Sequence, residues 1–412
     1  MTTESTAAGL TSGSSELRRL NVAMLFAALA AFGLLYSTQA LLPSIGASFG
    51  VGPTSASLTV SAATGALALA ILPLSSLAES VGRVPVMRSG LLVACLFTFA
   101  AAAAPWFWLL VLARGLVGVA LAAVVAVAVA HLGDEVHPAE LGTAIGVYVA
   151  GNTLGGISGR LIPGLVEESS SWRAAIALLA VVALVASLAF TRLLPSPRRT
   201  TDGVDATSAR EHVGAVRDLL RDGSIVRLCL LAFLLMGGFV ACYNYLTFRL
   251  EAAPLGLSTT VTSLLFLAYL AGTVSSPLAG RLSDRFGRRR LALGGIVVSL
   301  AGLALMLPDH LAAITVGLLV FTAGFFATHS VASSWVSSLA AGRRGQAAAM
   351  YLLAYYLGSS AFGALIGLAY QYDGWPTTAA AIALLFVLGG LTVLSIPRPP
   401  SDAGAGTPPP AP

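Results

Sequence analysis

Twelve long runs of apolar residues divide this chain, and they constrain its fold more than any other feature. Most are about as long as a helix must be to cross the hydrocarbon of a bilayer, which takes roughly 20 residues. Charges, prolines or glycines bound the runs, which fall at 22–43, 56–78, 86–104, 106–130, 141–165, 173–194, 225–248, 260–282, 290–307, 311–338, 346–370 and 376–396. The pattern predicts an all-α membrane protein with twelve transmembrane helices in a lipid bilayer.

The composition excludes a soluble enzyme. Only 10% of the 412 residues are charged, whereas a soluble domain carries about 25%. The net charge of +5 is no argument for nucleic acid in a membrane chain, so we expect no nucleic-acid partner. Cys95, Cys229 and Cys242 lie in or near apolar runs without metal-ligand spacing, so we expect packing roles and neither a metal nor a cofactor.

A short polar segment, HLGDEVHP, resembles a metal-ligand pattern only loosely. Its candidate ligands are His131, Glu135 and His137. The segment falls between the fourth and fifth runs, and we expect it to be a solvated loop.

The chain repeats itself at an offset of 205 residues. The second run is followed by LAESVGR (77–83) and the eighth by LSDRFGR (282–288). The same offset places the region of Tyr36 opposite Tyr243. Internal similarity of this kind indicates duplication, and it predicts two pseudo-symmetric six-helix bundles. The expected divisions are a cytoplasmic tail at 1–20, bundles at 21–194 and 225–396, a cytoplasmic linker at 195–224 and a disordered Pro-rich tail at 397–412.

The arginines predict the orientation, because positive charge gathers on the cytoplasmic side. All 23 basic residues are arginine, and 19 of them fall in the tails and on the linker side of the spans. Arg114 and Arg160 fall within spans, and only Arg173 and Arg249 fall on the opposite side. We therefore expect both termini in the cytoplasm.

The segment GRLSDRFGRRR (280–290) resembles the signature of the major facilitator superfamily, found between the second and third helices of each half. The first half has a diverged copy in which Ser75 replaces the leading glycine. Helix N-termini attract carboxylates, so we expect Glu79 to cap the start of helix 11, and Asp284 that of helix 5, when the cytoplasmic side is closed. Charges that only fix topology are the alternative. The expected gating residues are Glu79, Gly82, Arg83, Gly280, Asp284, Arg285, Gly287 and Arg288.

Small residues spaced four apart mark one face of helices 2, 5, 8 and 11. Such faces let membrane helices approach closely. In the resembled superfamily, helix 2 crosses helix 11 and helix 5 crosses helix 8 between the halves, so we expect these faces there. The expected packing residues are Gly151, Gly155, Gly156, Gly159, Gly272, Ser276, Gly363 and Gly367.

Polar residues within the spans are candidates for the transport pathway. GNTLGG (151–156) is similar to a Gly-Pro-x-x-Gly-Gly motif of exporters in this superfamily, with asparagine in place of proline. An arginine in the fourth span matches an accompanying Arg-x-x-x-Gly pattern, and a histidine in the tenth can titrate near neutral pH. We expect these two to face the central cavity. The alternative for the arginine is a structural donor to backbone carbonyls, and for the histidine it is a structural role; for the uncharged candidates it is hydrogen bonding between helices. The candidates are Arg114, His329, Tyr36, Gln39, Asn152, Tyr243 and Asn244.

From 20 to 396 the order of motifs resembles bacterial inner-membrane efflux permeases of the YnfM type. YSTQALLP (36–43), GNTLGGISGRLI (151–162), ATHSVASSW (327–335) and YYLGSS (355–360) carry this resemblance. It implies a monomeric inner-membrane transporter that works by alternating access, with proton-coupled efflux of a small organic molecule as the leading function. Proton-coupled uptake of a sugar or metabolite and a non-transporting sensor are the alternatives. Helix 1 contains no carboxylate, which counts against a simple acidic proton relay.

Overall fold

The described part of the chain is helical, and its helices form two bundles. The structure is a computed structural model that describes residues 9–196, 217–340 and 342–397. Most of the expected linker and of the Pro-rich tail lies outside these residues.

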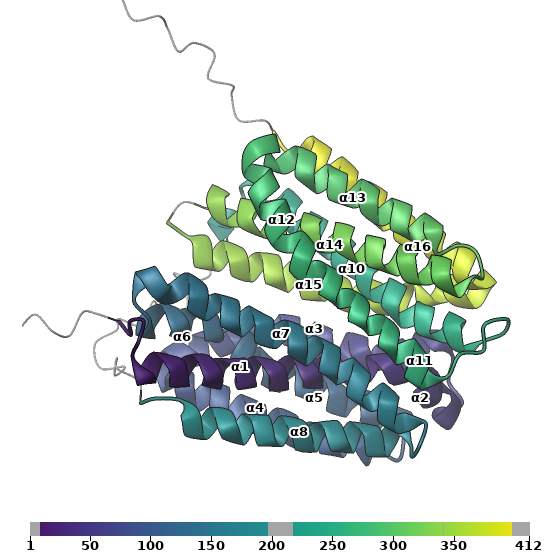
Figure 1. The fold of residues 1–412 in the computed structure, drawn as a ribbon, viewed down its shortest axis with the longest axis horizontal. Helices are drawn as coiled ribbons and strands as arrows, with labels where there is room; N and C mark the ends of the chain where they lie inside the picture. Colours follow the sequence, from purple (N-terminus) through teal and green to yellow (C-terminus); the bar gives the residue numbers. More distant parts are fainter. Residues whose placement is uncertain (1–8, 197–216, 341, 398–412) are drawn as a thin grey trace, which may run out of the picture.

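The first bundle is drawn in purple to teal in Figure 1. Its helices make up six spans. The first and fourth spans are interrupted, so they comprise more than one helix. The helices are α1 (Ser15–Leu35), η1 (Gln39–Leu41), α2 (Leu42–Phe49), α3 (Pro53–Val81), α4 (Arg83–Ala102), α5 (Phe107–Val125), α6 (Ala128–Glu135), α7 (Pro138–Glu167) and α8 (Trp172–Leu193).

The second bundle lies above the first in Figure 1. Its helices also make up six spans. Its eighth span has three parts, and the helix named α16 contains the turn between spans 11 and 12 at Asp373 and Gly374. The helices are α10 (Gly223–Glu251), α11 (Thr259–Leu264), η2 (Leu265–Tyr269), α12 (Leu270–Phe286), α13 (Arg288–Leu305), α14 (Leu311–Leu339), α15 (Arg344–Leu365) and α16 (Gly367–Ser395).

Ten helical segments among the described residues are long and apolar enough to cross a membrane. The two remaining spans are α7 and α13, which pack along α1 and α14. Both carry charges, including Arg160 in α7 and three arginines at the start of α13. The twelve-helix fold predicted from the apolar runs is therefore confirmed.

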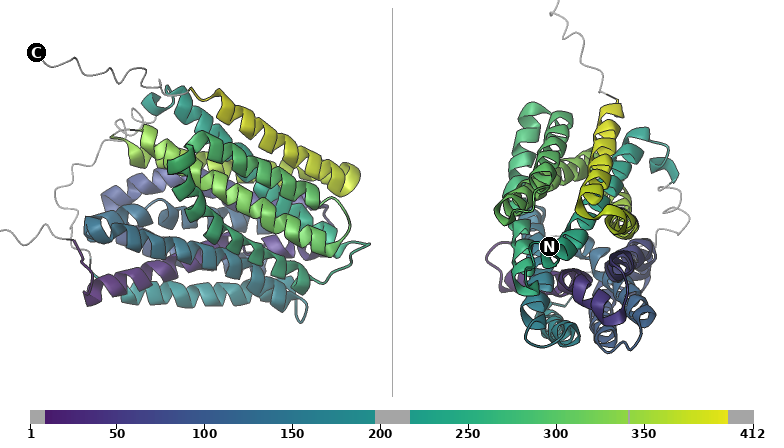
Figure 2. Two further views of the ribbon diagram at one scale, coloured as in Figure 1. Left: turned by 45° about the horizontal axis from the view of Figure 1, so that its top comes forward. Right: turned by 90° about the vertical axis from the view of Figure 1, so that its right-hand side faces the viewer.

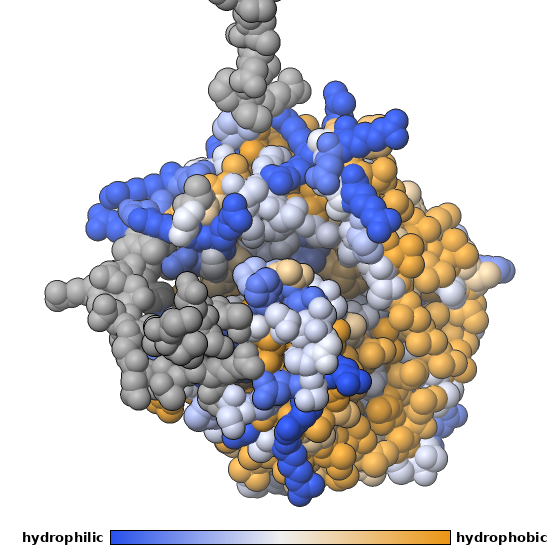
Figure 3. Space-filling view, turned by 60° about the vertical axis from the view of Figure 1, so that its left-hand side comes forward, coloured by the Kyte–Doolittle hydropathy of each residue, from blue (hydrophilic) through white to orange (hydrophobic). Residues whose placement is uncertain are grey.

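The two bundles meet along a seam, and their main contacts, among the residues that the structure describes, lie on one side of the molecule. We call the side on which α8 ends and α10 begins the linker side, and the opposite side the far side. The contacts between the halves join α3 to α15 and α16, α7 to α11 and η2, α10 to η1, α2 and α3, and α11 to η1. Figure 2 shows the halves as two layers, and Figure 3 looks from the linker side into a hollow between them. The structure is thus open on the linker side and closed on the far side.

The small-residue faces on helices 2 and 11 lie at the seam. A Cβ atom added at Gly363 would lie 3.2 Å from Ser61 Oγ, and one added at Gly367 would contact Thr54. Helix 5 also meets helix 8 across the seam, through α7, α11 and η2.

The predicted packing residues of helices 5 and 8 do not serve that crossing, and this part of the prediction is wrong; Gly164 of α7, which packs on Ser263 of α11, serves it instead. Gly151, Gly155 and Gly159 pack on the α1 backbone within the first half, and Gly272 packs on Phe326 of α14 within the second. Spacing of four defines a helix face but not its partner. The small-residue faces of α7 and α12 pack on α1 and α14 of their own bundles, because these neighbours run alongside them.

Candidate functional site

Two polar residues related by the internal repeat meet across the seam. Gln39 in η1 and Asn244 in α10 are 205 residues apart, which is the offset of the duplication. Gln39 Nε2 donates a hydrogen bond to Asn244 Oδ1 at 2.7 Å, and Asn244 Nδ2 donates to the carbonyl of Gly363 at 3.2 Å. Both side chains are fully buried. Equivalent residues lie at equivalent places in the two halves, so this pair lies near the pseudo-symmetry axis.

Arg160 of α7 extends this contact into a network. Its Nε donates to Gln39 Oε1 at 2.6 Å, one terminal nitrogen donates to the Gly156 carbonyl at 2.5 Å, and the other donates to Tyr269 Oη at 3.0 Å. The guanidinium also lies over the Tyr36 ring, 3.9 Å from its centroid. Only 1% of Arg160 is exposed.

Further hydrogen bonds join the two halves on the far side, around this network. Tyr245 donates to Ser57 Oγ across the seam at 3.0 Å, and Ser360 donates to the Ser61 carbonyl at 2.8 Å. At the rim, hydrogen bonds from Thr260, and also from Ser258, hold the pKa of Glu168 below its usual value. Glu168 therefore remains ionised near neutral pH. These contacts connect the two halves on the far side.

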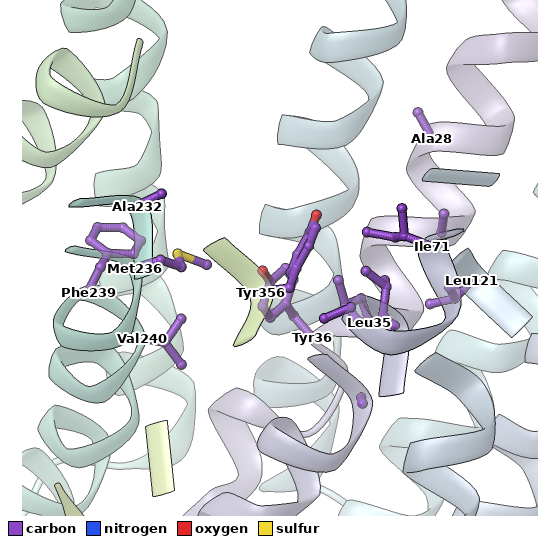
Figure 4. Close-up of a cluster of buried hydrophobic side chains, with 14 of the residues drawn as sticks. Ala28, Leu35, Tyr36, Ile71, Leu121, Ala232, Met236, Phe239, Val240 and Tyr356 are labelled. Carbon is purple, nitrogen blue, oxygen red and sulfur yellow. The ribbon is translucent and has the colours of Figure 1, made fainter. Parts of the chain in front are cut away.

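An aromatic cluster lies at the centre of the seam. Figure 4 places Tyr36 and Tyr356 between apolar side chains of the two halves, with Met236 of α10 on one side and Leu35 on the other. The cluster extends through Tyr355, whose ring lies 5.2 Å from that of Tyr356, measured between centroids.

His329 of α14 joins the same cluster. Its ring lies 4.8 Å from that of Tyr355, and its Nδ1 lies 2.9 Å from Tyr351 Oη. The histidine is half-buried. A short chain of rings thus connects it to the seam.

Arg114 lies elsewhere, and the expectation that it faces the central cavity is not met in this conformation. It is fully buried within the first half. Its guanidinium donates to the Leu34 and Leu35 carbonyls and to Ser37 Oγ, where α1 is interrupted, and to the Thr59 carbonyl of α3. The alternative reading of Arg114, a donor to backbone carbonyls, describes this geometry.

The signature arginines join helices within each half. Arg83 pairs with Asp134 at the end of α6, and Arg288 donates to Ser338 at the end of α14. Asp284 is exposed and Glu79 is half-buried in this linker-open conformation.

Other candidates take less central places. Tyr243 hydrogen-bonds to Thr322 within the second half at 2.7 Å. Asn152 is half-buried, and its Oδ1 has no hydrogen-bond partner among the described residues. The solvated loop expected at HLGDEVHP is incorrect in part, since His131 and Glu135 lie on α6 and are only 4% and 6% exposed.

Comparisons with known proteins place this architecture in a family. The model of the Major Facilitator Superfamily matches residues 24–272 and 250–411. The chain belongs to the major facilitator superfamily. It is 40% identical to the inner membrane transport protein YnfM of Escherichia coli, over 91% of this chain and 90% of that protein. It is 35% identical to the uncharacterized MFS-type transporter YybF of Bacillus subtilis, over 94% and 96% of the two chains.

A solved structure agrees on the fold. A bacterial homologue of the human lysosomal transporter Spinster, in an inward-facing and unoccupied conformation, superposes with a TM-score of 0.77 at 17% identity, covering 94% of this chain and all of that one. As a member of the superfamily, this chain is a multi-pass membrane transporter of small molecules that works by alternating access.

Sequence reasoning missed the central place of Arg160. The signal was available, because Tyr148, Asn152, Gly156 and Arg160 recur every four residues and so share one face of helix 5. That face lies next to the face of Gly151, Gly155 and Gly159, which packs on α1.

Proposed function

We propose that this transporter exports a small organic molecule in exchange for protons. The observation that carries the proposal is the one-sided closure of the seam, with a hollow on the linker side and a polar network across the far side. Cargo enters the hollow, the linker side closes, and the network around Gln39 and Asn244 separates to release it. The exporter-like GNTLGG segment lies on α7, the helix that carries Arg160, and it favours export over uptake.

We infer that the linker side is cytoplasmic in a bacterial inner membrane. The distribution of the arginines supports this orientation. Each chain contains its own seam and hollow, so we propose that it works as a monomer. A cysteine at Arg285 that reacts with a membrane-impermeant maleimide from outside intact cells would contradict the orientation.

We propose that Glu79 and Asp284, the carboxylates of the two signature segments, stabilise the state that is closed on the linker side. When the hollow closes, Asp284 at the end of α12 approaches the start of α7, and Glu79 of α3 approaches the start of α15. A helix N-terminus stabilises a nearby carboxylate. The exposure of Asp284 in the linker-open structure is compatible with a contact that forms only in the other state.

His329 is the proposed proton carrier. No described carboxylate lies in the middle of a span, and an imidazole changes charge near neutral pH. The hydrogen bond to Tyr351 and the contact with Tyr355 connect it to the seam, so its protonation can respond to which side is open.

Proteoliposomes containing a pH-sensitive dye test this coupling. A panel of ethidium, arabinose and benzoate, added with and without an imposed pH gradient, covers a cation, a sugar and an organic anion. We expect at least one compound to move against protons in the wild type, and His329→Ala to remove the dependence on the gradient. His310→Ala is the matched control, because His310 is exposed at the far end of α14, and its coupling should be unchanged.

Other outcomes would contradict the proposal. Movement of compound and protons in the same direction would indicate uptake by symport. Proton coupling through His329 would be excluded if the transport rate did not depend on the imposed pH gradient. It would also be excluded if the His329→Ala protein kept the pH profile of the wild type.

A further inference from the structure

Arg160 is a buried cation whose counter-charge is missing from the described residues. No described carboxylate forms an ion pair with it. Its partners are a side-chain amide, a backbone carbonyl and a phenol, together with the faces of Tyr36, Tyr269 and Phe266. Burying a charge is costly unless it is well paired, and here neutral oxygens and aromatic rings supply the compensation.

These partners belong to different halves of the molecule. Gln39, Gly156 and Tyr36 are in the first half with Arg160, whereas Tyr269 and Phe266 come from η2 in the second. Gln39 is itself held by Asn244 of the second half. Opening of the far side moves the second half away, so it removes the Tyr269 hydrogen bond and two of the three aromatic faces.

Arg114 makes a useful contrast, because all of its hydrogen-bond partners lie in its own half. Separation of the halves leaves those contacts in place. Of the two arginines buried in the middle of the spans, only Arg160 has partners in both halves.

We propose that Arg160 binds the acidic group of an organic anion in the state that is open on the far side, so that the cargo is an organic anion such as a carboxylate. This proposal rests on the proposed transport function and names its substrate class. A guanidinium receives a carboxylate through two parallel hydrogen bonds, which replace the lost contacts. Tyr148, Asn152 and Gly156 continue the same face of α7 from Arg160 towards the linker side. Tyr148 and Asn152 offer a hydroxyl and an amide group to the rest of the cargo.

Cysteine labelling of the far side tests the proposal on purified protein. Ser263 of α11 is fully buried against Gly164 of α7 across the seam, so Ser263→Cys is modified by a maleimide only when the far side opens. The three native cysteines are replaced by alanine, and thermal unfolding checks the fold. Benzoate and acetate are compared with their uncharged counterparts benzamide and acetamide at equal ionic strength.

We expect at least one carboxylate, and neither amide, to raise the labelling rate several-fold, because a ligand favours the state it binds best. Arg160→Gln should remove the effect and Arg160→Lys should keep part of it. Arg173→Gln is the matched control: it removes an arginine of the same half on the far side, where Arg173 binds the Ala104 carbonyl. Its response should equal that of the wild type.

Two results would overturn the anion proposal and leave alternating access standing. Labelling that proceeds but responds equally to carboxylates and amides would exclude an anion as the ligand. A carboxylate effect that survives in Arg160→Gln would exclude Arg160 as the site. A cysteine at Ser263 that is never labelled would contradict far-side opening, and with it both the proposed function and the anion site.

Discussion

A disulfide between Ser61→Cys and Gly363→Cys is expected to abolish transport. Ser61 is on α3 and Gly363 on α15, so the bond would join the two halves beside the Asn244 contact. A Cβ atom at Gly363 would lie 3.2 Å from Ser61 Oγ, a spacing that suits a disulfide with little backbone movement. Alternating access requires this part of the seam to separate. Transport of any cargo should therefore stop on oxidation and return on reduction.

The control is a second disulfide that lies within one half. Ser187→Cys places a thiol beside native Cys95, whose Sγ lies 3.8 Å from Ser187 Oγ. This bond joins α4 and α8 of the first half, which move together, and transport should continue after oxidation. If the oxidised Ser61–Gly363 pair still transports, the far side does not open by separation of α3 and α15.

Arg114→Leu is expected to destabilise the protein by several kcal/mol. The change leaves the carbonyls of Leu34, Leu35 and Thr59 buried without their arginine donor. Each buried polar group left without a partner costs about 1–3 kcal/mol. Thermal unfolding in detergent should show a large fall in the midpoint temperature. Arg114→Lys should restore only part of it, because an ammonium lacks the five donors of a guanidinium.

Arg344→Leu is the control for loss of an arginine, because Arg344 is exposed at the start of α15. Its stability should stay within about 0.5 kcal/mol of the wild type. A stable Arg114→Leu protein that binds cargo but does not transport it would instead support the pathway role expected from sequence.

The sequence predicted the architecture well because bilayer physics leaves few choices. A run of about 20 apolar residues has to cross as a helix. A single repeated segment, LAESVGR and LSDRFGR, was enough to divide the spans into two halves. The interrupted first span was harder to foresee. Its break at Tyr36–Thr38 depends on Arg114, a residue almost 80 positions later that supplies donors to the freed carbonyls.

Prediction of the site was less complete, because it depends on which helix faces which. Gln39 and Asn244 were named separately as polar residues of the pathway, and their equivalence under the 205-residue offset was not used. Arg160 lies in the GNTLGGISGRLI segment but was not named among the pathway candidates. The glycines of α7 indicated a close contact, but the sequence could not distinguish α1 of the same half from helix 8 of the other.

Distances between spin labels on both sides of the membrane test alternating access most directly. One pair, at Ser80 and Arg285, spans the linker side, and a second pair, at Ser170 and Ala252, spans the far side; all four residues are exposed. Two populations are expected. One has the long linker-side and short far-side distances of this structure, and the other has the reverse. Asp284→Asn should reduce the second population several-fold, since it loses its contact with the start of α7. A far-side distance that remains short in every condition, with or without cargo and a pH gradient, would contradict the account.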